Sequence, residues 1–194
     1  MADRFPIGAD GNRGLRVDNG ITPGTLLVAS PSINSDYFQT SVVLITEHNR
    51  TGHMGFVINK QTIAEVRTAL IQHGMEWPYQ DFMYEGGPVN RSAMVMLHSQ
   101  EWRSQNTLGV GSICSISSDK LMFEKMCNFD IPQARKFMFG QCVWVEGQLE
   151  REIYTARSWL TLPATERLLW DIEGEELWHT AIEECARATM DQFI

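Results

Sequence analysis

The chain has 194 residues, 43% of them hydrophobic, and a net charge of −8 that is concentrated after residue 145. This size and apolar content predict one folded domain, and no apolar run approaches the roughly 20 residues of a membrane-spanning helix, so we expect a soluble protein without a membrane contact. The acidic carboxyl-terminal quarter repels phosphate backbones and no basic cluster compensates, which argues against nucleic acid as a partner.

Residues 1–23 combine six Gly and Pro residues with scattered charges and show no hydrophobic period. Such a segment buries too little apolar surface to offset the entropy lost on ordering. We therefore expect a mobile amino-terminal arm ahead of a single domain at residues 24–194. The arm lacks the apolar centre of a secretory signal and carries acids that organelle-targeting peptides avoid, so we expect a cytoplasmic location.

Apolar runs predict strands as the first elements of the domain. Thr25–Ala29 and Ser41–Thr46 are rich in Leu, Val and Ile without polar alternation, which is typical of strands buried on both faces. The turn Asn49–Gly52 has the Asn and Gly chemistry of a hairpin loop and precedes a third run, Met54–Lys60. The second and third strands are therefore expected to pair antiparallel.

Helix and strand signals then alternate irregularly. Thr62 and Glu65 form a capping-box pattern for a helix that ends at Gly74. Further helices are expected at Ser118–Cys127, Pro132–Phe139 and Gly174–Gln192, and further strands at Phe82–Glu85, Ala93–His98, Ser112–Ser117 and Cys142–Glu146. This mixture favours an α+β fold over a wound parallel sheet.

The chemistry-bearing motifs of common enzymes are absent from the sequence. There is no phosphate loop, no GxGxxG fingerprint, no GxSxG elbow and no HExxH zinc motif. The cysteines form neither a CxxC pair nor a zinc-ribbon spacing, so we expect buried, reduced thiols at Cys114, Cys127, Cys142 and Cys185. We expect neither a metal site nor a cofactor.

The first candidate site surrounds the hairpin turn and contains Glu47, His48 and His53, with Asn59 and Lys60 at the end of the next strand. An antiparallel pair brings both histidines together, and an imidazole beside a carboxylate can serve as general base or metal ligand. The alternative is structural. In that interpretation His48 caps the loop, Asn59 and Lys60 form a turn, and no third metal ligand is evident.

The second candidate site joins Asp36 and the glycines Gly86 and Gly87 to a turn that holds Gln148 and Glu150. Glycines permit close approach of a ligand to backbone donors, and the amide and carboxylate offer complementary hydrogen bonds. In the structural alternative, the glycines take positive φ in an ordinary turn and Glu150 stabilises the start of a helix.

Six tryptophans could form either a core or a binding surface. Trp144 and Trp159 lie in apolar strand contexts and are expected in the core. Trp77 stands beside Pro78 and Tyr79 in a polar connection, so we expect it to be the exposed aromatic residue.

A set of short motifs resembles the YqgE/AlgH family of small bacterial proteins. The matching segments are Gly24–Pro31 with Asp36 and Phe38, His48, Gly52–Lys60, Gly86–Val89, Leu97–His98, Gly140, Trp144, Gly147–Glu150, Glu152–Ile153, Trp159–Leu160 and Trp178. The resemblance implies a bent, bifurcated sheet that closes into a pseudo-barrel with flanking helices. The family includes a proposed regulator of alginate synthesis genes, and the resemblance implies no catalytic residue set. His53 departs from the Ala that is more frequent there.

Two hypotheses of function follow. The first is a non-enzymatic binding or regulatory module that contacts a protein or small-molecule partner and, lacking a helix-turn-helix pattern, does not bind DNA directly. The second is an enzyme, hydrolytic in type, with an unrecognised active site near His48 and Asn59.

Overall fold

The structure is a computed structural model that describes residues 21–191. The arm expected at residues 1–23 therefore falls almost entirely outside the described residues. The first described residue, Ile21, is buried in the core. Directly after it, the Gly24 N–H donates to the carbonyl of Ile45 at 2.9 Å.

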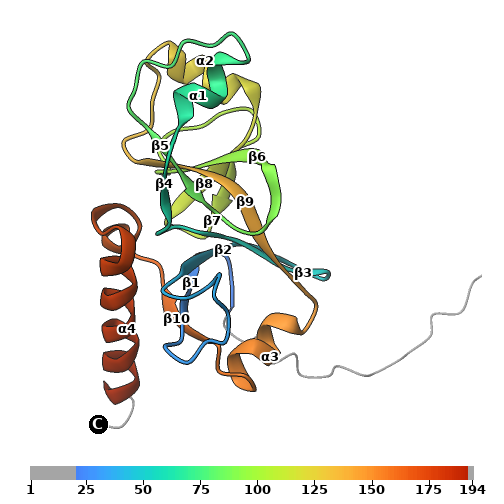
Figure 1. Cartoon of the computed structure of the whole chain (residues 1–194), viewed down its shortest axis with the longest axis vertical. Coiled ribbons are helices and arrows are strands. Elements are labelled where there is room, and N and C mark those ends of the chain that lie inside the picture. Colours follow the sequence, from blue (N-terminus) through green and yellow to red (C-terminus); the bar gives the residue numbers. More distant parts are fainter. Residues whose placement is uncertain (1–20, 192–194) are drawn as a thin grey trace, which may run out of the picture.

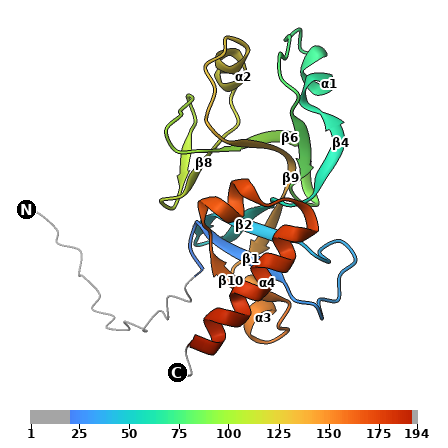
Figure 2. The same cartoon turned by 90° about the vertical axis from the view of Figure 1, so that its left-hand side faces the viewer.

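Within the described residues, ten strands form a strongly curled, mostly antiparallel sheet with helices at its flanks, so the expected α+β fold is confirmed (Figures 1 and 2). The strand order is β10-β1-β2-β3-β9-β6-β8-β7, and β5 pairs with both β4 and β9. The strands are β1 (Thr25–Ala29), β2 (Val42–Asn49), β3 (Gly52–Val57), β4 (Gln61–Glu65), β5 (Phe82–Glu85), β6 (Val89–His98), β7 (Leu108–Val110), β8 (Cys114–Ser117), β9 (Arg135–Val145) and β10 (Trp159–Pro163).

The helices are α1 (Val66–Ile71), α2 (Lys120–Cys127), α3 (Gln148–Tyr154) and α4 (Gly174–Asp191), with a π-helical turn, η1, at Arg167–Asp171. The cap of α2 lies one residue later than the expected Ser118, because the carboxylate of Asp119 accepts the N–H of Met122 at 2.9 Å. No helix in residues 21–191 is long and apolar enough to cross a membrane.

One expected helix has the wrong start, and a second is wrong altogether. The segment from Thr62 forms β4, where the Thr62 hydroxyl donates to the carbonyl of Met83 at 2.8 Å, and the helix starts only at Val66. Pairing with β5 thus replaces the capping box. The segment expected as a helix at Pro132–Phe139 enters β9 instead, because that strand has hydrogen-bonded neighbours on both edges. Burial on both faces removes the polar alternation that would have identified a strand.

Strand β9 organises the two halves of the sheet. Over Phe137–Phe139 it pairs with β5 in parallel and with β6 antiparallel, so these strands lie on opposite edges of β9. Further along, Cys142–Val145 pairs with β3. The short link Gly86–Pro88 must therefore cross β9 from one edge to the other. The expectation that Gly86 and Gly87 supply positive φ is wrong, since neither does; they allow close approach of the backbones instead.

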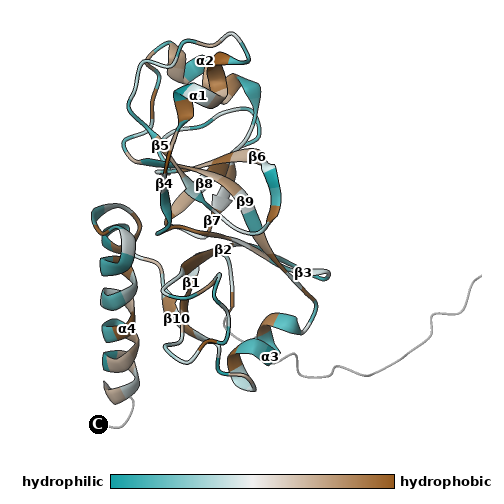
Figure 3. Ribbon diagram, viewed as in Figure 1, coloured by the Kyte–Doolittle hydropathy of each residue, from teal (hydrophilic) through white to brown (hydrophobic). Residues whose placement is uncertain are grey.

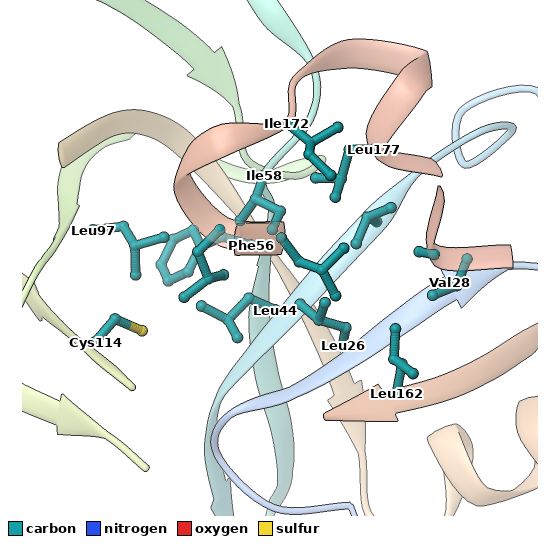
Figure 4. Packing of buried hydrophobic residues seen from close by; sticks show 14 of the residues in the cluster. Leu26, Val28, Leu44, Phe56, Ile58, Leu97, Cys114, Leu162, Ile172 and Leu177 are labelled. Atoms are coloured by element: carbon teal, nitrogen blue, oxygen red, sulfur yellow. The ribbon is translucent and has the colours of Figure 1, made fainter. Parts of the chain in front are cut away.

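Buried side chains form three clusters around the sheet. One cluster lies between the sheet and α4 and includes Leu44, Phe56 and Leu177 (Figure 4). The second packs against α3 and contains Trp144 and Trp159, which confirms their expected place in the core. In Figure 3 the hydrophobic colours concentrate on the central strands, whereas α4 shows mainly hydrophilic colours.

The third cluster joins α1 and α2 to the upper part of the sheet in Figure 1. It contains Trp77, which is only 6% exposed, so the expectation of an exposed Trp77 is wrong. Its indole N–H donates to Asp81 at 3.0 Å, and its ring packs against Tyr79 and Phe137. The polar neighbours in the sequence concealed a residue that long-range packing buries.

Candidate functional site

The sheet splits where β6 separates from β9. Val89 pairs with Gln141 and Met94 pairs with Phe139, so four residues of β6, 90–93, stand opposite the single residue Gly140. Asn90 takes a left-handed φ of 52° at the start of this bulge. Bulges occur frequently at barrel rims and beside functional sites because they interrupt pairing and redirect side chains.

A cavity of about 430 Å³ lies at this split, and we call it the split cavity. This volume falls within the range of small-ligand sites, and the mouth of a curled sheet is a common place for one. The residues that line it come from β2, β3, β6, β7, β8 and β9, the loop before β7 and the residue after β8: Glu47, Met54, Phe56, Asn90, Ala93, Met94, Val95, Asn106, Leu108, Ile116, Ser117, Ser118 and Gln141.

Three polar side chains that line the split cavity are uncommitted, in the sense that they have no polar partner among the described residues. Within the described residues, Glu47, Asn90 and Gln141 make no side-chain hydrogen bond or ion pair. Asn106 differs, because its amide binds both the N–H of Ser118, at 3.0 Å, and the hydroxyl of Ser118, at 2.9 Å. The cavity therefore presents a carboxylate and two amides whose hydrogen-bonding groups remain available to a ligand.

The apolar part of the split cavity continues onto the open sheet surface. Met54 and Phe56 of β3 form one wall, and Ile116 of β8 belongs to the opposite half of the sheet. Along β9, residues 141, 143 and 145 share a face, and the side chains of Val143 and Val145 are exposed. The pairing of β6 with β9 ends at Gln141, so the part of β9 that carries Val143 and Val145 lies beyond the point where the two strands separate.

The structure separates the first predicted cluster. Glu47 lies opposite Met54 and lines the split cavity, whereas the next pair, His48 and His53, projects from the other face of the hairpin. The two imidazole rings stack with centroids 4.3 Å apart. On that face they approach Glu150 of α3, whose carboxylate lies 4.0 Å from Nε2 of His53.

His53 is buried without a hydrogen bond among the described residues. His53 is only 4% exposed, and neither of its ring nitrogens has a hydrogen-bond partner within residues 21–191. Burial lowers the pKa of His53, the neighbouring His48 lowers it further, and Glu150 partly opposes the shift. The ring is therefore neutral at neutral pH. No group of three metal-binding side chains within residues 21–191 has the geometry to hold a metal ion.

Asn59 and Lys60 lie at the far end of the hairpin from His48. Asn59 is buried, accepts the N–H of Val42 at 2.9 Å and donates to the carbonyls of Thr40 and Gly174 at 2.8 and 3.0 Å. It thereby ties β3 to the start of α4. Lys60 donates to the carbonyl of Tyr37 and lies over its ring, and burial lowers the pKa of its ammonium group.

The second predicted cluster is distributed over three places. Asp36 is exposed in the loop between β1 and β2, and Gly86 and Gly87 are buried beneath β9. Gln148 and Glu150 belong to the first turn of α3, as the structural alternative held. Gln148 accepts the N–H of Val145 at 3.2 Å and donates to Glu152 at 2.9 Å. In the described residues, no hydrogen bond or ion pair connects Asp36 to either of the other places.

Sequence reasoning missed the polar residues Asn90 and Gln141 and a buried hydroxyl–imidazole pair. Ser117 Oγ lies 3.0 Å from Nε2 of His98, whose Nδ1 lies 2.8 Å from the carbonyl of Ser99. Ser117 is only 2% exposed and also binds the hydroxyl of Thr107 at 2.7 Å. These residues hold the loop between β6 and β7 onto the sheet. No short motif marks them, because pairing between β6 and β8 brings them together.

The chain is similar to proteins of known sequence and structure over most of its length. A protein of Shewanella baltica, named only as a UPF0301 protein, is 34% identical over 166 residues, which cover 80% of this chain and 86% of the relative. A UPF0301 protein of Shewanella denitrificans is 32% identical over 163 residues, 82% of this chain and 88% of the relative.

Two solved structures share the fold. The solution structure of the AlgH protein from Pseudomonas aeruginosa aligns with a TM-score of 0.69 at 28% identity, over 82% of this chain and 86% of that one. The crystal structure of DIP2367 from Corynebacterium diphtheriae gives the same score at 24% identity, over 86% of this chain and 88% of that one. A sequence model described as AlgH-like (DUF179) matches residues 26–189, and the chain belongs to this AlgH-like family.

Proposed function

We propose that this protein is a non-enzymatic binding module whose ligand site is the split cavity and whose ligand is an extended peptide segment of a partner protein. The observation that carries the proposal is the set of uncommitted groups, Glu47, Asn90 and Gln141, at the edge of an apolar cavity where the sheet splits. A peptide backbone offers N–H and C=O groups to the amides, and its side chains fit the apolar walls.

Charge favours a neutral or basic segment. Within residues 21–191, Glu47 is the one charged residue that lines the split cavity. The whole chain carries a net charge of −8, so an acidic segment would be repelled. The exposed valines of β9, Val143 and Val145, extend the apolar contact beyond the cavity itself.

A regulatory role, as the family resemblance suggests, would then act through protein contact rather than through DNA. The described part of the chain contributes no Lys or Arg to the lining of the split cavity that could meet a phosphate backbone. The acidic surface of α4, which begins with Glu175 and Glu176, would also repel nucleic acid.

A hydrolase is the second candidate, favoured by the 3.0 Å contact between Ser117 Oγ and Nε2 of His98. An imidazole oriented by a third group and bonded to a hydroxyl is the arrangement of a nucleophile and its base. The burial of Ser117 and its bond to Thr107 favour the structural role, since a nucleophile must reach its substrate.

The test uses blocked tripeptides as probes and observes side-chain amide signals by NMR. We expect Ala-Lys-Ala and Ala-Leu-Ala, acetylated and amidated, to shift the signals of Asn90 and Gln141 saturably at millimolar concentration, and Ala-Asp-Ala to bind more weakly because of Glu47. Ala93→Trp should fill the cavity and abolish the shifts, whereas Ala64→Trp, at an exposed site on β4, should preserve them. Equal shifts in both variants, or no shifts in the parent protein, would refute the proposal.

A further inference from the structure

A second cavity, independent of the split cavity, lies at the carboxyl-terminal end of α2. Its volume is about 600 Å³, and we call it the Phe129 cavity. It sits between that helix end and the segment that follows α1, in the upper part of the molecule in Figure 1. The described residues that line it are Gly74, Met75, Glu76, Trp77, Pro78, Glu124, Cys127, Asn128 and Phe129.

Phe129 is an exposed aromatic residue in a restricted conformation. It is 73% exposed, and its φ of 65° lies in the left-handed region, which bulky residues rarely adopt. Its N–H donates to the carbonyl of Met126 at 2.9 Å directly after α2, and its ring meets Tyr79 edge-on at 6.2 Å. Both contacts hold the aromatic ring beside the cavity rather than in the core.

Trp77 provides a rigid wall. Its indole N–H is fixed by Asp81 at 3.0 Å, and its ring contacts Tyr79 at 5.4 Å and Phe123 at 6.2 Å between centroids. Because these neighbours fix the ring, a ligand that contacts Trp77 meets a wall that is already ordered.

The charge of the Phe129 cavity is negative. Glu76 is exposed and forms no ion pair among the described residues, and Glu124 pairs with Lys120 at 2.9 Å in a solvent-exposed contact that contributes little. Among the residues that the structure describes, no Lys or Arg lines the cavity. The nearby Lys125 is directed elsewhere, to the carbonyl of Arg103 and to Asp130. The carboxyl-terminal end of α2 adds partial negative charge.

We infer that the Phe129 cavity binds a cationic side chain, Lys or Arg, of a partner polypeptide. Aromatic rings attract such a cation through their faces, and Glu76 and Glu124 complement its charge. The aliphatic stem of Lys or Arg can at the same time cover Met75 and Pro78. Carboxylates at the cavity disfavour an anionic group, and an uncharged group would leave Glu76 without a partner.

The experiment uses n-butylammonium and n-butylguanidinium as mimics of the two side chains, with 1-butanol and butyrate as uncharged and anionic comparisons. Binding is followed by NMR through the indole N–H of Trp77. We expect saturable shifts with both cations and none with butyrate. We also expect Glu76→Gln and Phe129→Leu to weaken binding of the cations by about three-fold each.

Two matched variants control for general effects of charge and of ring removal. Glu146→Gln removes an exposed acid beside α3, and Phe82→Leu removes an exposed ring on β5; both should leave the affinity for the cations unchanged. The inference is overturned if 1-butanol shifts the Trp77 signal as strongly as the cations do. It is also overturned if Glu76→Gln binds them as tightly as Glu146→Gln. Neither result bears on the split cavity.

Discussion

Gly87 and Gly140 touch backbone to backbone where the chain crosses β9. A Cβ added to Gly140 would lie 2.1 Å from the carbonyl oxygen of Gly87, and one added to Gly87 would lie 2.1 Å from the carbonyl carbon of Gln141. Gly140 also takes a φ of 73°. This contact lets β5 and β6 occupy opposite edges of one strand and places the bulge of β6, and with it the split cavity, beside Gln141.

The first prediction follows from that crossing. Gly87→Ala and Gly140→Ala should each lower the free energy of unfolding by about 3 kcal/mol or more, because backbone atoms that cannot move aside meet the new methyl group. Urea denaturation measures the effect. Gly109→Ala is the control, since nothing lies within 4 Å of its added Cβ, and it should change stability little. A tolerated Gly87→Ala would show that the crossing is looser than described.

Local sequence patterns predicted some elements of the fold and missed others. The hairpin of β2 and β3 was predictable because its turn, which begins at Asn49 and ends at Gly52, and its apolar runs are local signals. The amphipathic helix α4 was predictable for the same reason. Strand β9 was only half recognised. Its first part owes its conformation to strands on both edges, which no short window of sequence reveals.

The site was less predictable than the fold. The pairing of His48 with His53 followed from the hairpin, and Glu47 was identified as a candidate, but neighbouring residues of a strand point to opposite faces, which separates Glu47 from both histidines. Asn90 and Gln141 line the same cavity because a bulge in β6 stands opposite Gly140. Such an arrangement brings together residues about fifty positions apart and leaves no motif in the sequence.

A second prediction concerns the pH dependence of stability. The folded protein holds the pKa of His53 below its ordinary value, mainly by burial, so the unfolded chain binds more protons once the pH falls below about 6.5. The free energy of unfolding should therefore decrease as the pH falls through this region. His98, which is fully buried and also has a lowered pKa, acts in the same direction.

Substitution of single histidines tests whether His53 causes this pH dependence of stability. His53→Leu should flatten the fall in stability between about pH 7 and pH 5, because it removes a group whose protonation opposes folding. His73→Leu, at an exposed position, should keep the parent slope. Thermal unfolding across the pH range provides the measurement. An unchanged slope in His53→Leu would mean that His53 accepts its proton without loss of the folded state.

A third prediction concerns the buried ammonium group of Lys136. It lies 2.9 Å from the carboxylate of Glu173 and 3.2 Å from the carbonyl of Ile58, and burial lowers its pKa while Glu173 opposes that shift. Glu173→Gln should cost about 2 kcal/mol, since it leaves a buried charge with a weaker partner. Adding Lys136→Met to that variant should restore part of the loss. Chemical denaturation of the single and double variants decides the matter, and additive losses would contradict the pairing.

The final prediction concerns Glu152, which joins α3 to two strands. One of its carboxylate oxygens accepts the indole N–H of Trp144 at 3.0 Å and that of Trp159 at 2.8 Å. Glu152→Ala should lower the free energy of unfolding by about 2 to 3 kcal/mol, because both largely buried indoles lose a charge-assisted partner. Glu146→Ala, at an exposed position just before α3, should change it by less than about 0.5 kcal/mol. If urea denaturation gave equal stabilities for the two variants, water rather than Glu152 would satisfy the tryptophans, and apolar contacts together with the hydrogen bond from Val145 to Gln148 would hold α3.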